Sequence, residues 1–268
     1  MKKIKILILL IGIILQVDRL AHAQILLEQG KIKLALQPGA TIVDSLTIHN
    51  NSNQEARGHI YWEDFLYLPP FDGKKKFLPS GTTPLACGAW INFSPKEFAL
   101  PPFGKKTIAY TINVPKDARG GYYGVLFFEK DAEEMSGKKG LNVVTRVGSL
   151  FFLETQDRSK MATLENVTMT LHTVRGSFTN KGNVILIPDG IFYILDEQGL
   201  VVDRGEAEKI YLPPAETAEY SMSFSPELPV GRYTMVMTMD LEDGDVMVKE
   251  IDFEKMSSAE LRVLKTRD

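Results

Sequence analysis

The chain has 268 residues, of which 44% are apolar and 24% charged, and this length and composition suit two folding domains of ordinary size. The formal net charge is −3, a modest acidity that argues against nucleic acid or an anionic membrane surface as a partner. Cys87 is the single cysteine, which excludes an internal disulfide and leaves stabilisation to the core.

Residues 1–23 have the pattern of a secretory signal peptide. They open with the basic run MKKIK, continue with an apolar run from Ile6 to Leu15, and end with the small-residue cleavage pattern Ala21-His22-Ala23. A membrane-spanning helix needs ~20 apolar residues, so this run is too short to be one, and no later segment comes closer. We expect a mature chain that begins near Gln24, carries a net charge of −6, has no integral membrane segment or lipid anchor, and is periplasmic or otherwise exported.

The remaining pattern predicts an all-β protein built from two tandem immunoglobulin-like β-sandwiches. Turn signals recur at short intervals, the runs between them are rich in Val, Ile, Thr, Tyr and Phe, and helical periodicity is almost absent. Along one such run, Ile108, Tyr110 and Ile112 alternate with polar residues and should face a core. The strands predicted in the first half, as many as an immunoglobulin-like sandwich needs, are Ile32–Leu36, Thr41–Asn50, Gly58–Leu66, Ile91–Ser94, Lys106–Val114, Gly121–Glu129 and Leu141–Leu153.

A polar break at Glu154–Lys160 (ETQDRSK) precedes a restart of the strand pattern. We therefore expect an N-terminal sandwich at 24–155, a linker at 156–161, a C-terminal sandwich at 162–254, and a polar tail at 255–268 that is either a short helix or disordered. Asp243-Gly244 between two alternating runs predicts a hairpin. The strands predicted in the second half are Ala162–Thr173, Arg175–Asn180, Gly190–Leu195, Val201–Ile210, Ala218–Phe224, Arg232–Leu241 and Val246–Phe253.

Patterns that carry chemistry are missing from the sequence. The four histidines lack metal-ligand spacing, and the acidic turn Asp240–Asp245 lacks the spacing of a calcium loop. Cys87 has no histidine close in sequence, and no hydrolase elbow, phosphate-binding loop or Rossmann fingerprint occurs. Two distant carboxylates can converge in a hydrolase site without leaving a pattern, but nothing favours them here. We expect no catalytic residue, no metal, no cofactor and no enzymatic activity.

The last predicted strand of the first half is long and apolar on both faces, and one edge of it is the obvious place for a partner to add a strand. An open edge of this length invites aggregation unless a partner covers it. The residues of one face are the candidate client-binding residues: Val143, Thr145, Val147, Ser149 and Phe151.

Short phrases within this architecture resemble a known family. VTRVGSLFF at Val144–Phe152 and FTNKGNV at Phe178–Val184 look like a PapD-like periplasmic pilus-assembly chaperone. INFSP at Ile91–Pro95 and PKDA at Pro115–Ala118 resemble the same family and, equally, the exported WxL-interacting surface proteins. The likeness covers most of the mature chain, by order of elements and short phrases more than by one diagnostic motif.

The resemblance implies donor-strand complementation, in which the chaperone lends a strand to an incomplete pilin and holds the pilin's terminal carboxylate with a cleft arginine and lysine. Aligned on its end-of-strand phrase, this chain has Ser149 at the cleft lysine position, and its first strand offers Lys31 and Lys33 instead of an arginine. The candidate carboxylate contacts are Lys33 and Arg146. The implied partners are exported, pilin-like subunits and an outer-membrane usher.

The alternative is a non-catalytic surface protein, structural or adhesive, that binds wall polymer or another surface protein. The WxL-interacting group normally carries a C-terminal membrane segment and a basic tail. The stretch Phe253–Asp268 is too polar for such a segment, which favours a free periplasmic protein.

Overall fold

The computed structural model describes residues 25–132, 144–225, 227–242 and 246–268. Within them the chain is built from β-strands with one short 3₁₀ turn, Gly88–Trp90, which confirms the predicted all-β class. The leader at 1–23 and the hairpin predicted at Asp243-Gly244 lie outside the described residues. No helix long and apolar enough for a membrane span occurs in the described part of the chain.

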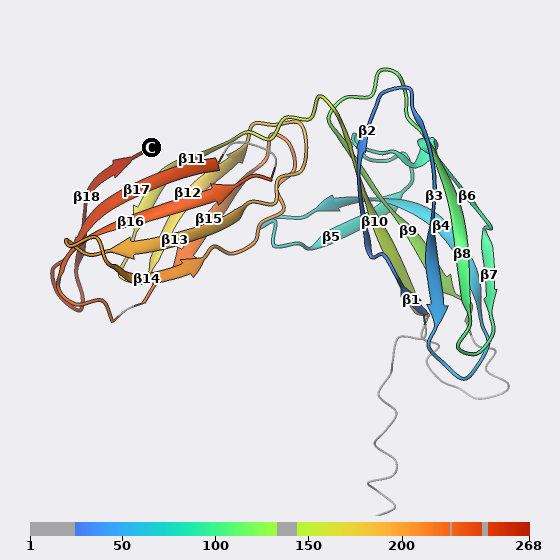
Figure 1. Cartoon of the computed structure of the whole chain (residues 1–268), viewed down its shortest axis with the longest axis horizontal. Helices are drawn as coiled ribbons and strands as arrows, with labels where there is room; N and C mark the ends of the chain where they lie inside the picture. The colour runs from blue at the N-terminus through green and yellow to red at the C-terminus, as the bar shows by residue number, and fades with distance from the viewer. Residues whose placement is uncertain (1–24, 133–143, 226, 243–245) are drawn as a thin grey trace, which may run out of the picture.

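The first domain consists of two packed sheets, at the right of Figure 1. The small sheet has four strands in the order β1 (Ile25–Leu27), β3 (Thr41–Asn50), β8 (Lys105–Asn113) and β6 (Ile91–Ser94). The large sheet has six, in the order β2 (Lys31–Leu36), β10 (Arg146–Thr155), β9 (Gly121–Lys130), β4 (Ala56–Tyr67) and β5 (Lys75–Pro79), with β7 (Glu97–Leu100) also on β4.

Strand alternation decides which side chains fill the space between these sheets. On β8, the predicted inward residues Ile108, Tyr110 and Ile112 are all fully buried there. On β9, both faces are buried, since Leu126 and Phe128 face the first-domain core while Tyr123 and its alternate neighbours face the second domain. This double burial explains why β9 reads as a continuous aromatic run rather than as an alternating one.

The N-terminal segment changes sheets, and this positions the candidate site. Strand β1 pairs antiparallel with β3 in the small sheet, whereas β2 pairs parallel with β10 in the large sheet. The chain crosses between them at 28–30, where Gly30 has open space around its α-carbon. The crossing closes one side of the sandwich with a single segment that serves both sheets.

The second domain packs a three-stranded sheet against a five-stranded one. The polar tail expected at 255–268 is neither helical nor without structure, because it contributes the edge strand β18 to the larger sheet. The small sheet has the order β11 (Ala162–Met169), β12 (Thr173–Asn180), β15 (Thr217–Ser223), and the large one β14 (Val201–Glu206), β13 (Asp189–Leu195), β16 (Gly231–Asp240), β17 (Val246–Lys255), β18 (Leu261–Arg267).

A buried asparagine at the end of β3 closes the first sandwich. The side-chain amide of Asn50, which is 2% exposed, donates to the carbonyl oxygens of Gln54 (2.7 Å), Leu100 (3.2 Å) and Pro101 (3.0 Å). Its oxygen accepts from the backbone N–H of Ser52 (3.1 Å). One side chain therefore satisfies backbone groups of two separate segments, its own turn and the turn before β8.

The second domain repeats this arrangement at the end of β12. The amide of Asn180, which is fully buried, donates to the carbonyl oxygens of Val184 (2.8 Å) and Leu212 (2.9 Å), and its oxygen accepts from the N–H of Gly182 (2.8 Å). In each domain the distant acceptor is a buried leucine followed by two prolines and a residue with positive φ. That residue is Phe103 (φ 54°) in the first domain and Ala215 (φ 65°) in the second.

The two domains share an apolar cluster that joins side chains of the large sheet to the core of the second domain. Tyr67 and Tyr211 stack with ring centroids 5.0 Å apart, and the N–H of Tyr211 donates to the carbonyl of Phe71 (2.9 Å). The N–H of Ile185 donates to the hydroxyl oxygen of Tyr123 (2.7 Å). Figure 1 shows the second domain beside one end of the large sheet, with its strands running across those of the first domain.

Replacing Asn50 or Asn180 by Ala should destabilise the chain strongly. Each change leaves buried backbone carbonyl groups without a hydrogen-bond donor. The free energy of unfolding should fall by about 1–3 kcal/mol for each unsatisfied group. Denaturant unfolding of the two variants measures the loss. The matched control Asn92→Ala, on an exposed position of β6, should stay close to the parent, and equal stability of all three variants would contradict this account.

Candidate functional site

The face of the large sheet that points away from the first-domain core is called here the outer face. Alternation and register place on it aromatic, aliphatic and charged side chains from all of the main strands. The second domain packs on one end of this face. Its members are Lys31 and Lys33 of β2, Arg146, Leu150 and Phe152 of β10, Tyr123, Val125 and Phe127 of β9, Tyr61, Glu63, Phe65 and Tyr67 of β4, and Lys75 and Phe77 of β5.

On the side away from β9, strand β10 pairs with β2 along part of its length and has no pairing strand in the described chain along the rest. From Leu150 to Thr155 it pairs with β2, and the N–H of Leu150 donates to the carbonyl of Gly30 (3.0 Å). From Arg146 to Ser149 no strand of the described chain pairs on that side. The open edge, defined as Arg146–Ser149, lies beside the place where the N-terminal segment has crossed to the other sheet.

The hydrogen-bond directions on this open edge follow from its neighbours. The N–H of Lys130 on β9 donates to the carbonyl of Thr145 (3.0 Å), whereas Leu150 bonds toward β2. Backbone groups of an antiparallel strand alternate between its two sides. The N–H and C=O groups of Arg146 and Gly148 therefore point away from β9 and toward the open side.

The five candidate client-binding residues have different places in the structure. Val143 lies outside the described residues, and Thr145 is exposed just before β10. Val147 is half-buried against the first-domain core, while Ser149 and Phe151 are fully buried. The side chains of the last three point into the sandwich, and Phe151 lies where β2 already covers the edge. This stretch can therefore offer a partner its backbone more than its side chains.

Ser149, the residue at the cleft lysine position in the family comparison, points into the sandwich and not onto the outer face. Its hydroxyl donates to the carbonyl of Gln29 (2.7 Å) in the crossing segment. A lysine there would have to bury its ammonium group in the core, at a large desolvation cost. The serine instead ties β10 to the crossing, at the end of the open edge.

Arg146 lies on the outer face and is held by its neighbours. Its guanidinium donates to the hydroxyl of Tyr61 (2.9 Å) and to Glu63 (3.2 Å), and its central carbon lies 4.1 Å from the ring centroid of Phe127. The Tyr61 hydroxyl in turn donates to Glu129 (2.5 Å). The hydrogen bond to Tyr61 is the largest of the effects that raise the pKa of Arg146 above its usual value.

Lys33 also lies on the outer face, but it reaches across to the second domain. It pairs with Glu242, which also accepts from Lys160 (3.3 Å). Burial raises the pKa of Glu242, but the hydrogen bonds and charges of the two lysines outweigh burial and hold that pKa below its usual value. Lys33 and Arg146 thus share a face, and each is engaged by acids of this chain.

Two further lysines of the outer face lie over aromatic rings. The ammonium of Lys31 is 4.6 Å from the ring centroid of Phe152, and that of Lys75 is 4.7 Å from the ring centroid of Tyr67. Burial, and then the charge of Lys31, lower the pKa of Lys75. The Lys75 ammonium also donates to the carbonyl of Gly73 (3.1 Å), and within the described residues neither ammonium has a carboxylate partner within 4.0 Å.

Sequence reasoning missed Lys75 because the cluster Lys74-Lys75-Lys76 is typical of a solvated turn. The structure instead places Lys75 on strand β5, opposite Tyr67. The available signal was the alternation of Lys75 and Phe77 with Lys76 and Leu78 after a glycine turn, which is too short to predict a strand alone.

Groups suited to catalysis are not gathered in the described part of the chain. Cys87 is buried, and burial, followed by the charge of Asp64, raises the pKa of its thiol, which makes it a poor nucleophile. Among the residues with described positions, no cluster of three or more His, Cys, Asp or Glu side chains is arranged to hold a metal.

Solved structures resemble this geometry, whereas no family model and no curated protein matches the sequence. The class 5 fimbriae chaperone CfaA superposes with a TM-score of 0.50 and 12% identity, over 84% of this chain and 97% of that one. The chain has the two-domain fold of a fimbrial chaperone. At this identity the match establishes the fold and transfers no residue roles.

Two other solved structures match this chaperone fold over a similar span. A chain from a complex of a chaperone with the tip adhesin of CFA/I fimbriae has 13% identity and a TM-score of 0.49, covering 84% of this chain and 97% of that one. The YadV chaperone has 8% identity and a TM-score of 0.46, covering 86% of this chain and 100% of that one.

Hydrogen exchange should separate the two kinds of amide on β10. In the free protein the amides of Arg146 and Gly148 should exchange much faster than those of Val147 and Ser149, because only the latter bond to β9. Residue-resolved exchange by NMR measures this. Slow exchange at Gly148 in the free chain would show that the edge is covered.

Removing Lys31 should raise the pKa of Lys75. In Lys31→Met the repulsive charge is gone while burial of Lys75 persists, so the pKa should recover toward its ordinary value without reaching it. NMR titration of the lysine side-chain signals measures it. Lys76→Met, one residue along β5 on the opposite face, should leave the Lys75 pKa unchanged, and an equal shift in both variants would refute the coupling.

Proposed function

We propose that this protein is a non-catalytic, chaperone-like protein of the periplasm that binds exported, pilin-like subunits by β-strand addition at β10. The observation that carries the proposal is the open edge at Arg146–Ser149 in a chain with a fimbrial chaperone fold. Exposed strand edges are templates for pairing, and proteins normally cover or block them. Here β2 covers β10 from Leu150 onward but leaves Arg146–Ser149 unpaired, as expected if this part of the edge pairs with another polypeptide.

The added strand forms its ladder with the backbone of Arg146 and Gly148 and continues toward Thr145. Val147, Ser149 and Phe151 support that ladder from inside, since their side chains hold β10 against the first-domain core. In this binding mode affinity comes from backbone hydrogen bonds, and selection comes from the side chains that the added strand places on either face.

The position of β2 limits how far an added strand can run. Because β2 occupies the edge from Leu150 onward, with Lys31 as the residue opposite Leu150, an added strand has to end beside Lys31. A terminal carboxylate at that end comes within reach of Lys31, which lies on the strand next to the open edge. We therefore assign the carboxylate contact first to Lys31. Lys33 and Arg146 flank the path, and each would have to release an acid of this chain before binding a carboxylate.

The location and the further partner rest on other observations. The basic, then apolar, then small-residue pattern at 1–23 supports export to the periplasm. CfaA is described as a fimbriae chaperone, which supports a fimbrial subunit as the client. An outer-membrane usher as a second partner rests on the family resemblance of the sequence alone.

Blocking the open edge should abolish subunit capture. Arg146→Pro removes an N–H that points to the open side and spares the hydrogen bonds to β9, and proline is tolerated at edge positions of this kind. The tagged protein is incubated with periplasmic extract of its source, and the bound polypeptides are identified and quantified. We expect at least a tenfold loss of capture, as for the loss of about 1.4 kcal/mol or more.

The matched control is Arg146→Ala, which removes the same side chain and its contacts to Tyr61 and Glu63 but keeps the N–H. It should retain most of the capture. Equal capture by the proline variant and the parent would overturn the proposal. Retained binding of wall polymer by both variants, without any captured subunit, would favour the surface-protein alternative.

A further inference from the structure

The second domain has an open seam on one side. Its three-stranded sheet faces a five-stranded one, and on the β14–β15 side the two are joined by a bridge between Ala207 and Met222 and by a hydrogen bond from Glu208 N–H to the Ser221 carbonyl (3.2 Å). On the other side, the edge strand β11 of the small sheet does not pair with β17 or β18 of the large sheet. A groove of about 620 Å³ lies there. Its lining includes Leu164, Val167, Met239, Met247, Lys249 and Asp268.

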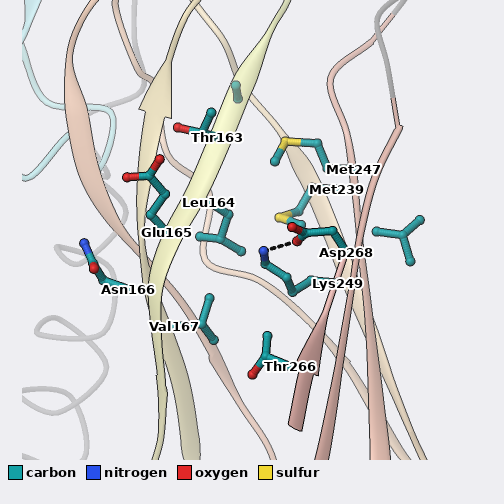
Figure 2. Close-up of a pocket in the computed structure, with 12 residues that line it drawn as sticks. Thr163, Leu164, Glu165, Asn166, Val167, Met239, Met247, Lys249, Thr266 and Asp268 are labelled. Carbon is teal, nitrogen blue, oxygen red and sulfur yellow. Dashed lines mark hydrogen bonds and ion pairs between the residues drawn. The ribbon is translucent and has the colours of Figure 1, made fainter.

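The groove has an apolar floor and one cation. Figure 2 shows Met239 and Met247 on one side, residues of β11 on the other, and the ion pair between Lys249 and Asp268 among them. The side chain of Lys249 is 14% exposed, whereas that of Asp268 is 85% exposed. An acid this exposed contributes little to stability, so an incoming carboxylate can replace it without a large loss.

The backbone of β11 offers hydrogen bonds at the same place. The N–H of Lys181 donates to the carbonyl of Met161 (2.8 Å), so by antiparallel alternation Thr163 also bonds toward β12. The N–H and C=O groups of Ala162 and Leu164 then point to the open side, where no strand of the described chain pairs. The buried hydroxyl of Thr163, which lines the groove, has no hydrogen-bond partner in that part of the chain.

A bulge limits the length of any strand added there. The β11–β12 register shifts between Glu165 and Thr168, and Asn166 has a φ of 53°. Bulges at sheet edges end regular pairing. The edge therefore suits a short segment and resists unlimited edge-to-edge association.

We propose that this groove binds a short extended segment of a partner polypeptide in which apolar side chains flank one carboxylate. The segment pairs with the backbone of Ala162 and Leu164 and places its apolar side chains on Met239 and Met247. Its carboxylate takes the place of Asp268 on Lys249. The site lies in the other domain from the open edge of β10, so it is independent of the proposed function.

The test uses the full mature chain labelled on its methionine methyl groups. The probe is a short, end-blocked peptide of alternating valine and threonine with one central glutamate, compared with its glutamine counterpart. We expect the glutamate peptide to shift the NMR signals of Met239 and Met247. Lys249→Met should weaken binding about tenfold, as expected when one partner of a partly buried charge pair is removed. Asp268→Asn should strengthen binding severalfold, because the internal competitor is lost.

Lys265→Met, on the exposed part of β18, is the matched control and should bind as the parent does, as should Arg146→Pro. The proposal is overturned by equal shifts with the glutamine peptide, by no shift at either methionine, or by an affinity that Asp268→Asn leaves unchanged. Self-association of the chain through this groove, seen as concentration-dependent shifts of the same signals without peptide, would also overturn it.

Discussion

The change of sheet by the N-terminal segment is the constraint on which the site depends. A single short segment forms β1 at the edge of the small sheet and then β2 at the edge of the large sheet. Where the segment pairs with the small sheet, it cannot also pair with β10. The hydroxyl of Ser149 holds the crossing by its bond to Gln29, so the switch occurs at one fixed position of β10. From Arg146 to Ser149, β10 is left without a paired strand on one side in the described chain, although β1 passes close to β10. The open edge is thus a geometric result of the crossing and needs no special residue of its own.

The outer face of the large sheet combines this edge with the contact to the second domain. At one end its aromatic side chains join the second-domain core, and at the other Arg146 lies over Phe127 within a chain of polar contacts through Tyr61. Lys75 lies at the second-domain end, over the rings of Tyr67 and Tyr211, and Lys31 lies over Phe152. Cations in such surroundings favour an anionic neighbour, because the anion offsets both burial and their mutual repulsion. In the proposed binding mode, Lys31 lies beside the point at which an added strand ends.

The sequence sufficed for the class and for the strands with strong alternation, such as Thr41–Asn50, because a period of two over ten residues has no helical interpretation. It did not reveal β1, β5 or β7, whose short runs give no clear alternation, although β6 of similar length was predicted. It also missed β18, whose strongly charged sequence suits a helix or a disordered tail as well as an edge strand. Residues such as Ser149 could be placed on one side of β10 by parity, but which side faces the core depends on the partner sheet, which is a tertiary property.

The paired asparagines have a consequence for how the halves relate. All partners of the Asn50 amide lie within the first domain, and all partners of the Asn180 amide lie within the second. Each domain thus closes its turn with its own buried asparagine, which bonds to the carbonyl of a leucine that precedes two prolines. No group of the other domain takes part in either set of bonds. Neither domain therefore needs the other to satisfy the backbone groups at this turn, even though the two share an apolar cluster elsewhere.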